Sequence, residues 1–255
     1  GWVERVRERN PPGAAKRFGP IAVGIARGLA APTLHLPQES HPRPELADRL
    51  GMTELGLDIM NTAPTGRVEL VADGEHLRRV VYGGMLKAGV SIDLMTADFK
   101  AMLVPDPGVD LSPSRGRDAP SIVQRLARMA QRGVEVRILH AGVPSGPALT
   151  QLKRIKKQLA SSGGGGITIR RCPRLHAKAV IIDAERMYLG SANLTGAGLG
   201  AKADQNRNHE LGVWTTSPDL VDSVSQYFNR LWEGEPCDGC GRKDVCPVPL
   251  EEPKL

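Results

Sequence analysis

Two short strings in the second half of the chain contain side chains suited to chemistry at phosphorus. LHAKAVIID places His176 and Lys178 two positions apart, and GSANLT, which follows closely, does the same for Ser191 and Asn193. Residues two apart on a strand point to the same face of the sheet. A neutral imidazole can attack a phosphodiester, while an ammonium and a carboxamide N–H can hold the charge that develops on its oxygens. The spacing therefore indicates one polar pair on each of two strands.

Two carboxylates complete the candidate site. Glu210 opens the strand predicted after the second string, and a carboxylate that accepts a hydrogen bond from His176 would hold the imidazole in one tautomer. Asp183 lies five residues after Lys178, so a strand would turn it to the opposite face. We interpret Asp183 as supporting the fold more than contacting the substrate.

The full pattern reads His176-x-Lys178-x4-Asp183 followed by Gly190-Ser191-x-Asn193. It resembles the signature of the phospholipase D superfamily, and the resemblance extends from about residue 68 to residue 232, roughly two thirds of the chain. The resemblance implies hydrolysis of a phosphodiester through a covalent phosphohistidine, without a catalytic metal. It implies His176 as the nucleophile, Lys178 and Asn193 as charge-stabilising groups, and Glu210 as the acid that the family places after its asparagine.

The family mechanism needs a second imidazole, which protonates the leaving oxygen. This chain has one copy of the motif, because no other histidine has a lysine two positions later. We therefore expect a homodimer in which two copies of His176 meet across a twofold axis. The alternative is an acid from the same chain, and His140 and His209 are then the first candidates.

A basic stretch precedes and includes the first string. From residue 151 to residue 178 the chain has eight lysines and arginines and no acid. Such a stretch is an electrostatic footprint for a polyanion, although a solvated helix face balanced by acids elsewhere is the plainer alternative. The residues predicted to bind substrate are Lys153, Arg154, Lys156, Lys157, Arg170, Arg171 and Arg174.

These features favour a nuclease that cleaves DNA or RNA. Three Trp, three Tyr and three Phe leave little material for base stacking, so phosphate contacts should dominate and sequence preference should be weak. A phospholipase or cardiolipin hydrolase of the same superfamily is the alternative, and it would need an apolar surface such as residues 21–32. A third hypothesis is a nucleic-acid-binding module without catalysis, against which the intact constellation argues.

The four cysteines of the chain suggest a metal site. Cys237-x2-Cys240-x5-Cys246 follows the last predicted helix, and three cysteines cannot pair among themselves. Cys172 is the remaining cysteine and the predicted fourth ligand. Thiolates suit zinc, our first choice, and an iron–sulfur cluster, our second. Unligated thiols in a loose tail are the alternative.

The elements around these residues alternate between helix and strand. Helices are predicted at residues 75–88, 121–132, 147–160 and 218–232, the last begun by a capping Ser217 and Pro218. Strands are predicted at residues 91–97, 134–140, 167–171, 179–183, 187–190 and 210–215. This succession predicts an α/β fold, and the resemblance implies a phospholipase D-like mixed β-sheet flanked by helices. The predicted domains are a partly helical N-terminal extension (1–67), a catalytic domain (68–232) and a Cys-rich metal-binding tail (233–255).

The composition is that of a folded protein with a modest positive charge. Hydrophobic residues make up 40% and charged residues 24%, and the formal net charge is +6. The longest apolar stretch, residues 21–32, is interrupted by Arg27 and falls short of the roughly 20 residues that a membrane span needs. No segment resembles a secretory signal. We expect a cytoplasmic protein without stable membrane association.

Overall fold

A computed structural model describes residues 66–107, 119–159 and 166–246. The chain divides into two units, residues 1–53 and 54–255, and all described residues belong to the second. The predicted N-terminal extension, apart from residues 66 and 67, lies outside the described residues, as does the apolar stretch 21–32. Within the described ranges, no helix is both long and apolar enough to cross a bilayer.

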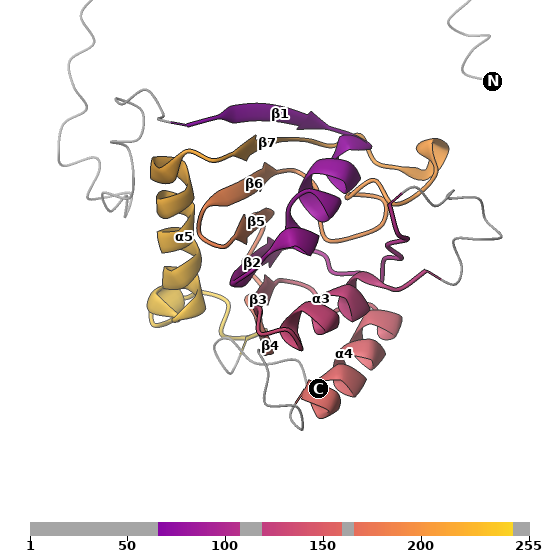
Figure 1. The fold of residues 1–255 in the computed structure, drawn as a ribbon. Coiled ribbons are helices and arrows are strands. Elements are labelled where there is room, and N and C mark those ends of the chain that lie inside the picture. Colours follow the sequence, from indigo (N-terminus) through magenta and orange to yellow (C-terminus); the bar gives the residue numbers. More distant parts are fainter. Residues whose placement is uncertain (1–65, 108–118, 160–165, 247–255) are drawn as a thin grey trace, which may run out of the picture. The chain divides into compact units, whose positions relative to one another are not determined.

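Seven strands form one mixed sheet in the order β1-β7-β6-β5-β2-β3-β4 (Figure 1). Strands β2, β3 and β4 are mutually parallel, whereas β5 is antiparallel to β2 and the neighbours from β5 to β1 pair antiparallel. The strands are β1 Val68–Ala72, β2 Ser91–Thr96, β3 Glu135–His140, β4 Ile167–Arg171, β5 Ala179–Ile182, β6 Arg186–Gly190 and β7 Leu211–Thr215. The predicted fold class, a mixed α/β sheet flanked by helices, is confirmed.

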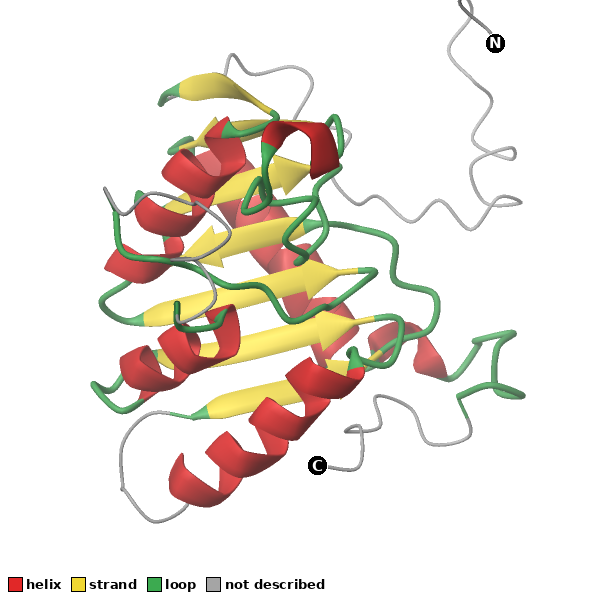
Figure 2. Cartoon of the chain, turned by 90° about the vertical axis from the view of Figure 1, so that its right-hand side faces the viewer, coloured by secondary structure: helices red, strands yellow, loops and turns green. Residues whose placement is uncertain are grey.

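Helices cover both faces of the sheet. Helices α3 (Ile122–Ala130) and α4 (Gly146–Leu159) lie on one face, and α5 (Pro218–Trp232) lies on the other (Figures 1 and 2). Alternate residues of each strand supply the two hydrophobic cores that result. The α3 side includes Ile92, Ile138, Ile182, Tyr188 and Trp214, and the α5 side includes Leu139, Ile181, Met187, Phe228 and Trp232.

The candidate catalytic residues lie beyond one edge of this sheet, which we call the site edge. Strands β2, β3 and β4 end there, because Thr96, His140 and Arg171 are in register. Strand β5 begins there beside Met95, and the end of β6 and the start of β7 meet at the same edge. Segments far apart in the sequence therefore place their polar residues together.

The local signals for helices explain most of these elements. Ser121 caps α3 through a capping box with Gln124, and Gly133, with φ of 97°, follows the end of that helix. Pro218 occupies the first turn of α5 as predicted, but the hydroxyl of Ser217 makes no capping hydrogen bond and is buried without a partner.

The prediction of one continuous helix at residues 75–88 is wrong, because the structure interrupts it. The structure has a π-helical segment, Leu77–Tyr82, and a separate 3-10 turn, Met85–Lys87. Gly83 and Gly84 separate them. A Cβ at Gly84 would lie 2.6 Å from the Trp214 ring and 2.7 Å from Ile182 Cδ1. The close approach of the backbone to the core, which the apolar periodicity does not reveal, interrupts the helix.

Candidate active site

His176 and Lys178 lie in the extended segment that leads into β5. The His176 side chain is exposed, whereas Lys178 is only 7% exposed. Lys178 Nζ lies 3.2 Å from His176 Nδ1 and 3.3 Å from Nε2, and it donates to the His176 carbonyl at 2.7 Å. Burial lowers the pKa of Lys178, while the charge of Glu210 opposes that shift. The arrangement presents an accessible imidazole beside a largely buried ammonium.

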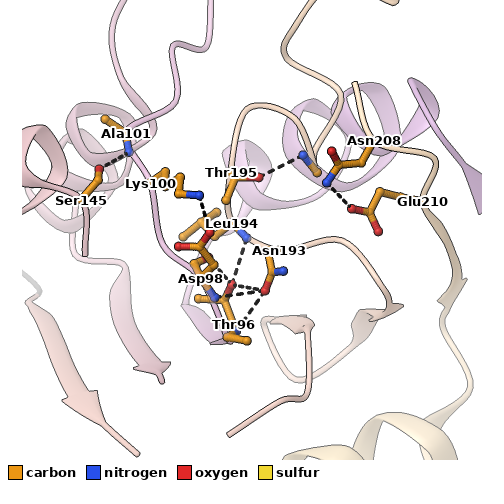
Figure 3. Close-up of polar contacts among 12 residues, drawn as sticks. Thr96, Asp98, Lys100, Ala101, Ser145, Asn193, Leu194, Thr195, Asn208 and Glu210 are labelled. Atoms are coloured by element: carbon orange, nitrogen blue, oxygen red, sulfur yellow. Dashed lines mark hydrogen bonds and ion pairs between the residues drawn. The ribbon is translucent and has the colours of Figure 1, made fainter. Parts of the chain in front are cut away.

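The side chain of Asn193 is held by its oxygen (Figure 3). Asn193 Oδ1 accepts hydrogen bonds from the amides of Ala97 and Asp98, each at 3.1 Å, and from Thr96 Oγ1 at 3.3 Å. These donors come from the end of β2 and the residues after it. Two amide donors fix the orientation of the carboxamide, so its Nδ2 is the group left to donate.

Ser191 and Glu210 form a pair at the ends of β6 and β7. Ser191 Oγ donates to Glu210 Oε2. Asn208 Nδ2 donates to Glu210 Oε1 at 3.0 Å (Figure 3). The predicted hydrogen bond from His176 to Glu210 is therefore corrected, because Ser191 is the partner instead. The register explains this, since Ser191 N donates to the Leu211 carbonyl and thus lies directly beside Glu210.

Sequence reasoning missed the residues that support this edge. Asp73 Oδ1 accepts from the Glu210 amide at 3.0 Å, across 137 residues of sequence. The buried His76 ring bonds the Tyr188 hydroxyl at 2.9 Å, and that hydroxyl accepts from the Ala192 amide at 3.1 Å. Burial raises the pKa of Tyr188 to about 12, so the hydroxyl stays protonated. No local motif marks these residues, because their partners are distant in the sequence.

Asp183 lies at the other end of β5. Its Oδ1 accepts from the amides of Gly89, Val90 and Ser91 at 2.8–3.1 Å. Burial alone would raise the pKa of Asp183, but these amide hydrogen bonds outweigh burial and hold the pKa below its ordinary value. Asp183 thus joins the turn after β5 to the segment before β2, away from His176.

A family model described as "Cardiolipin synthase, PLD-like domain" matches residues 109–232. That range contains both strings of the signature together with Glu210. Residues 109–232 are therefore similar to the phospholipase D superfamily.

Three solved structures are similar to this phospholipase D-like chain. Nuc from Salmonella typhimurium, a phospholipase D family member, has 22% identity and a TM-score of 0.47 over 66% of this chain and 95% of its own. NucT from Helicobacter pylori has 16% identity and a TM-score of 0.46 over 66% and 97%. The archaeal chromatin protein TrmBL2 has 21% identity and a TM-score of 0.40 over 74% and 62%. A search of curated proteins gave no match.

The remaining histidines of the described part of this phospholipase D-like domain differ in access. His140 is fully buried, its Nδ1 lies 2.5 Å from the Gly142 carbonyl, and its Nε2 is buried without a partner. Burial lowers the pKa of His140, which opposes its protonation. The His209 side chain is fully exposed, with Nδ1 3.6 Å from Asp73 Oδ1, beside a cavity of about 280 Å³. Of these two candidates, only His209 could exchange protons with a substrate.

The structure divides the basic stretch between two ends of the sheet. Helix α4 starts after β3 at the site edge and leads toward Ile167, which pairs with Val136 at the opposite edge (Figure 2). The second half of this helix therefore lies toward the edge opposite His176, and it carries four exposed cations: Lys153, Arg154, Lys156 and Lys157.

The three arginines after α4 have partners inside the fold. The Arg170 guanidinium lies over the Trp232 ring and donates to the Trp232 carbonyl. Arg171 donates to the Ala141 carbonyl at 3.2 Å, and Arg174 Nη1 lies 3.7 Å from Cys240 Sγ. Of the cations predicted to bind substrate, Arg171 and Arg174 thus lie at the site edge, where His176 also lies.

All four cysteines are described, and none forms a disulfide. Cys172, Cys237, Cys240 and Cys246 nevertheless line one small cavity of about 30 Å³. As the side chains are placed, no group of three or more His, Cys, Asp or Glu within the described ranges is arranged to hold a metal ion. The predicted juxtaposition of Cys172 with the tail is present, and the ligation itself stays a prediction.

Proposed function

We propose that this chain hydrolyses phosphodiester bonds of nucleic acid through a covalent phosphohistidine on His176, without a catalytic metal. The observation that carries the proposal is the exposed His176 imidazole with the Lys178 ammonium 3.2 Å from its Nδ1. An imidazole supplies the nucleophile that a metal-bound water supplies in metal-dependent nucleases. The similarity of residues 109–232 to the phospholipase D superfamily supports phosphodiester chemistry at the family level.

In the first step, a ring nitrogen of His176 attacks phosphorus, an N–P bond forms and the bond from phosphorus to the leaving oxygen breaks. Lys178 and the Nδ2 group of Asn193 hold the non-bridging oxygens as their charge increases. Asn193 suits this role because its oxygen is already engaged by Ala97 and Asp98. In the second step, water attacks phosphorus and gives its proton to the imidazole that protonated the leaving oxygen, while the N–P bond breaks and His176 is restored.

The leaving oxygen needs a proton, and we propose that His176 of a second copy of the chain provides it. An apolar row beside the site edge supports a dimer there. Leu70, Val213 and Leu189 are in register on β1, β7 and β6, on the α5 side of the sheet. Leu70 is 67% exposed, Leu189 38% and Leu211 54%, although large apolar side chains favour burial. Leu189 and Leu211 flank the strand ends that hold Ser191 and Glu210.

Nucleic acid is our proposed substrate because exposed cations lie in two places, at Arg174 beside the site and on the second half of α4. A polyanion longer than one diester could contact both groups, which we call the nucleic-acid track. The same apolar row favours a second candidate function, hydrolysis of a phospholipid such as cardiolipin, since an interfacial enzyme needs apolar surface close to its site. The sequence reasoning that confined such surface to residues 21–32 missed this row.

The test is a side-by-side digestion of labelled DNA, RNA and cardiolipin vesicles by wild type and His176→Asn, after brief EDTA treatment. We expect cleavage of a nucleic acid by wild type, and acid-labile, base-stable phosphate bound to the protein after rapid quenching. His176→Asn should have no measurable activity on any substrate. Exclusive cleavage of cardiolipin would overturn the nucleic-acid assignment. Loss of cleavage after EDTA, with circular dichroism and tightly bound metal unchanged, would overturn the metal-independent mechanism.

A further inference from the structure

The four thiols come together although 65 residues separate Cys172 from Cys237. Cys172 follows β4, and its amide donates to the His140 carbonyl at 2.8 Å. The other three cysteines follow α5, at the end of the described residues. All four line the same cavity of about 30 Å³, which is the space of one atom or one water molecule.

Consecutive turns of the tail present its three sulfurs together. Cys237 closes the 3-10 turn Glu235–Cys237, and the Cys240 amide donates to the Cys237 carbonyl at 3.1 Å. The Arg242 amide then hydrogen-bonds the Cys240 sulfur, and the Cys246 amide donates to the Arg242 carbonyl at 3.0 Å. Donors to sulfur of this kind are characteristic outer contacts of thiolate ligands.

The charge around the cavity suits an anionic metal centre. Four thiolates and one divalent cation carry a net charge of −2, which needs compensation in a partly buried site. Four cations line the same cavity, namely Arg171, Arg174, Arg242 and Lys243. The Arg174 guanidinium lies 3.7 Å from Cys240 Sγ and joins the tail to the segment before His176.

We propose that Cys172, Cys237, Cys240 and Cys246 bind one zinc ion in a closed structural site. The sulfurs are not in ligating positions as placed, but all four cysteines line the same cavity. Thiolates and the C-x2-C spacing select zinc over magnesium or calcium. The small cavity favours a single ion over an iron–sulfur cluster. In a reducing cytoplasm, disulfides do not compete for these thiols.

The zinc ion would connect the C-terminal tail to the segment that carries the nucleophile. Cys172 lies four residues before His176, and the Leu175 amide donates to the Cys172 carbonyl at 2.9 Å. A tetrahedral site has rigid angles, so it would hold this segment against the tail. The site is structural and does not depend on the proposed catalytic function.

The first experiment measures metal in wild-type protein purified without chelator. We expect about one zinc ion per chain, because a closed structural site retains its metal. Exchange for Co²⁺ should give the visible bands of tetrahedral thiolate coordination. Zinc-free protein with four titratable thiols, disulfides detected by mass spectrometry, or iron with labile sulfide would each overturn the proposal.

The second experiment compares substitutions at the proposed cysteine ligands with substitutions at neighbouring residues of the tail. Cys172→Ser and Cys237→Ser should each lose most of the zinc and melt at a lower temperature. Asp238→Asn and Asp244→Asn, exposed carboxylates of the same tail, should retain both zinc and melting temperature. Full zinc in Cys172→Ser would overturn the four-cysteine assignment. If a serine variant does not fold, the cobalt spectrum of wild type still decides. Both readouts are independent of cleavage, so failure here leaves the proposed function standing.

Discussion

The hydrogen bonds to Asn193 fix the orientation of its carboxamide group. Its oxygen is occupied by the Ala97 and Asp98 amides, so the Nδ2 group is oriented before any substrate arrives. Pre-oriented donors stabilise a transition state without reorganisation at the moment of reaction. The buried Thr96 supports the same geometry, because its hydroxyl accepts from the Leu194 amide at 2.9 Å.

This geometry gives a prediction at the residue scale. Asn193→Ala and Asn193→Asp should each lower the hydrolysis rate by about 10²-fold, the usual cost of one charge-stabilising donor. The aspartate still offers an oxygen to the two amides, so the fold should be retained. It has no N–H group to donate, so the hydrolysis rate should stay low. Steady-state kinetics on a small chromogenic diester is the measurement, with the exposed Asn206→Ala as control. Wild-type rates in Asn193→Asp would exclude Nδ2 as a donor to the transition state.

Residue spacing was sufficient to predict that His176 and Lys178 lie together, because the contact is local. It was insufficient for Glu210, whose partner depends on how β6 and β7 align beyond their last paired residues. Asp73 and the His76–Tyr188 pair were equally inaccessible, since each acts across more than a hundred residues. Contacts of that kind exist only once the sheet has formed.

At the scale of elements, short apolar runs bounded by turn residues predicted all strands except β1 to within a residue or two. The prediction of one continuous helix at residues 75–88 was wrong for a physical reason. The backbone at Gly84 approaches Trp214 too closely for a side chain, and hydrophobic periodicity does not encode such approaches.

Asp183 connects two elements through its charge, which predicts a pH dependence. Because amide hydrogen bonds depress the folded-state pKa, the stabilisation is present above the unfolded value and is lost as pH falls through the folded value. Asp183→Asn should lower the free energy of unfolding by about 1–3 kcal/mol near neutral pH. The difference from wild type should shrink toward zero below about pH 4. Melting curves across this range measure it, with the exposed Asp222→Asn as control. A difference independent of pH would contradict the charge-based role.

The position of α4 predicts that binding and chemistry can be separated. Charge reversal at Lys153, Arg154, Lys156 and Lys157 should flatten the salt dependence of binding to long nucleic acid, by about one unit of slope per lost phosphate contact. Hydrolysis of a small chromogenic diester should stay at the wild-type rate, because these cations lie toward the edge opposite His176. Reversal at the exposed Lys87 is the control. An unchanged salt slope would exclude α4 from the nucleic-acid track.

At the scale of the whole molecule, the origin of the imidazole that protonates the leaving oxygen determines whether one chain or two form the proposed site. Heterodimers of wild type and His176→Ala contain one nucleophile but no partner imidazole, so a shared site should leave them nearly inactive. Heterodimers with a different tag on each subunit can be purified by both tags. Their hydrolysis rate is then measured at protein concentrations above the dissociation constant of the dimer. Heterodimers with half the wild-type activity would instead indicate a self-sufficient chain.

His209→Ala distinguishes the remaining possibility. His209 is exposed beside Glu210, so it is the histidine of the described residues that could serve as an acid within one chain. A shared site predicts that His209→Ala retains activity. Loss of activity in His209→Ala, together with half-active heterodimers, would transfer the proton donation to His209.

The pairing of β1 with β7 has a consequence for biosynthesis. Of the strands in the described ranges, β1 leaves the ribosome first and β7 last, yet the two lie side by side and Asp73 accepts a hydrogen bond from the Glu210 amide. A nascent chain therefore contains His176 and Lys178 before Glu210, which follows Lys178 by 32 residues, is available to complete their surroundings. Translation that stops early yields a fragment with the nucleophile but without the finished site. We expect such fragments to lack the proposed hydrolytic activity, which should begin only after β7 has paired with β6 and β1.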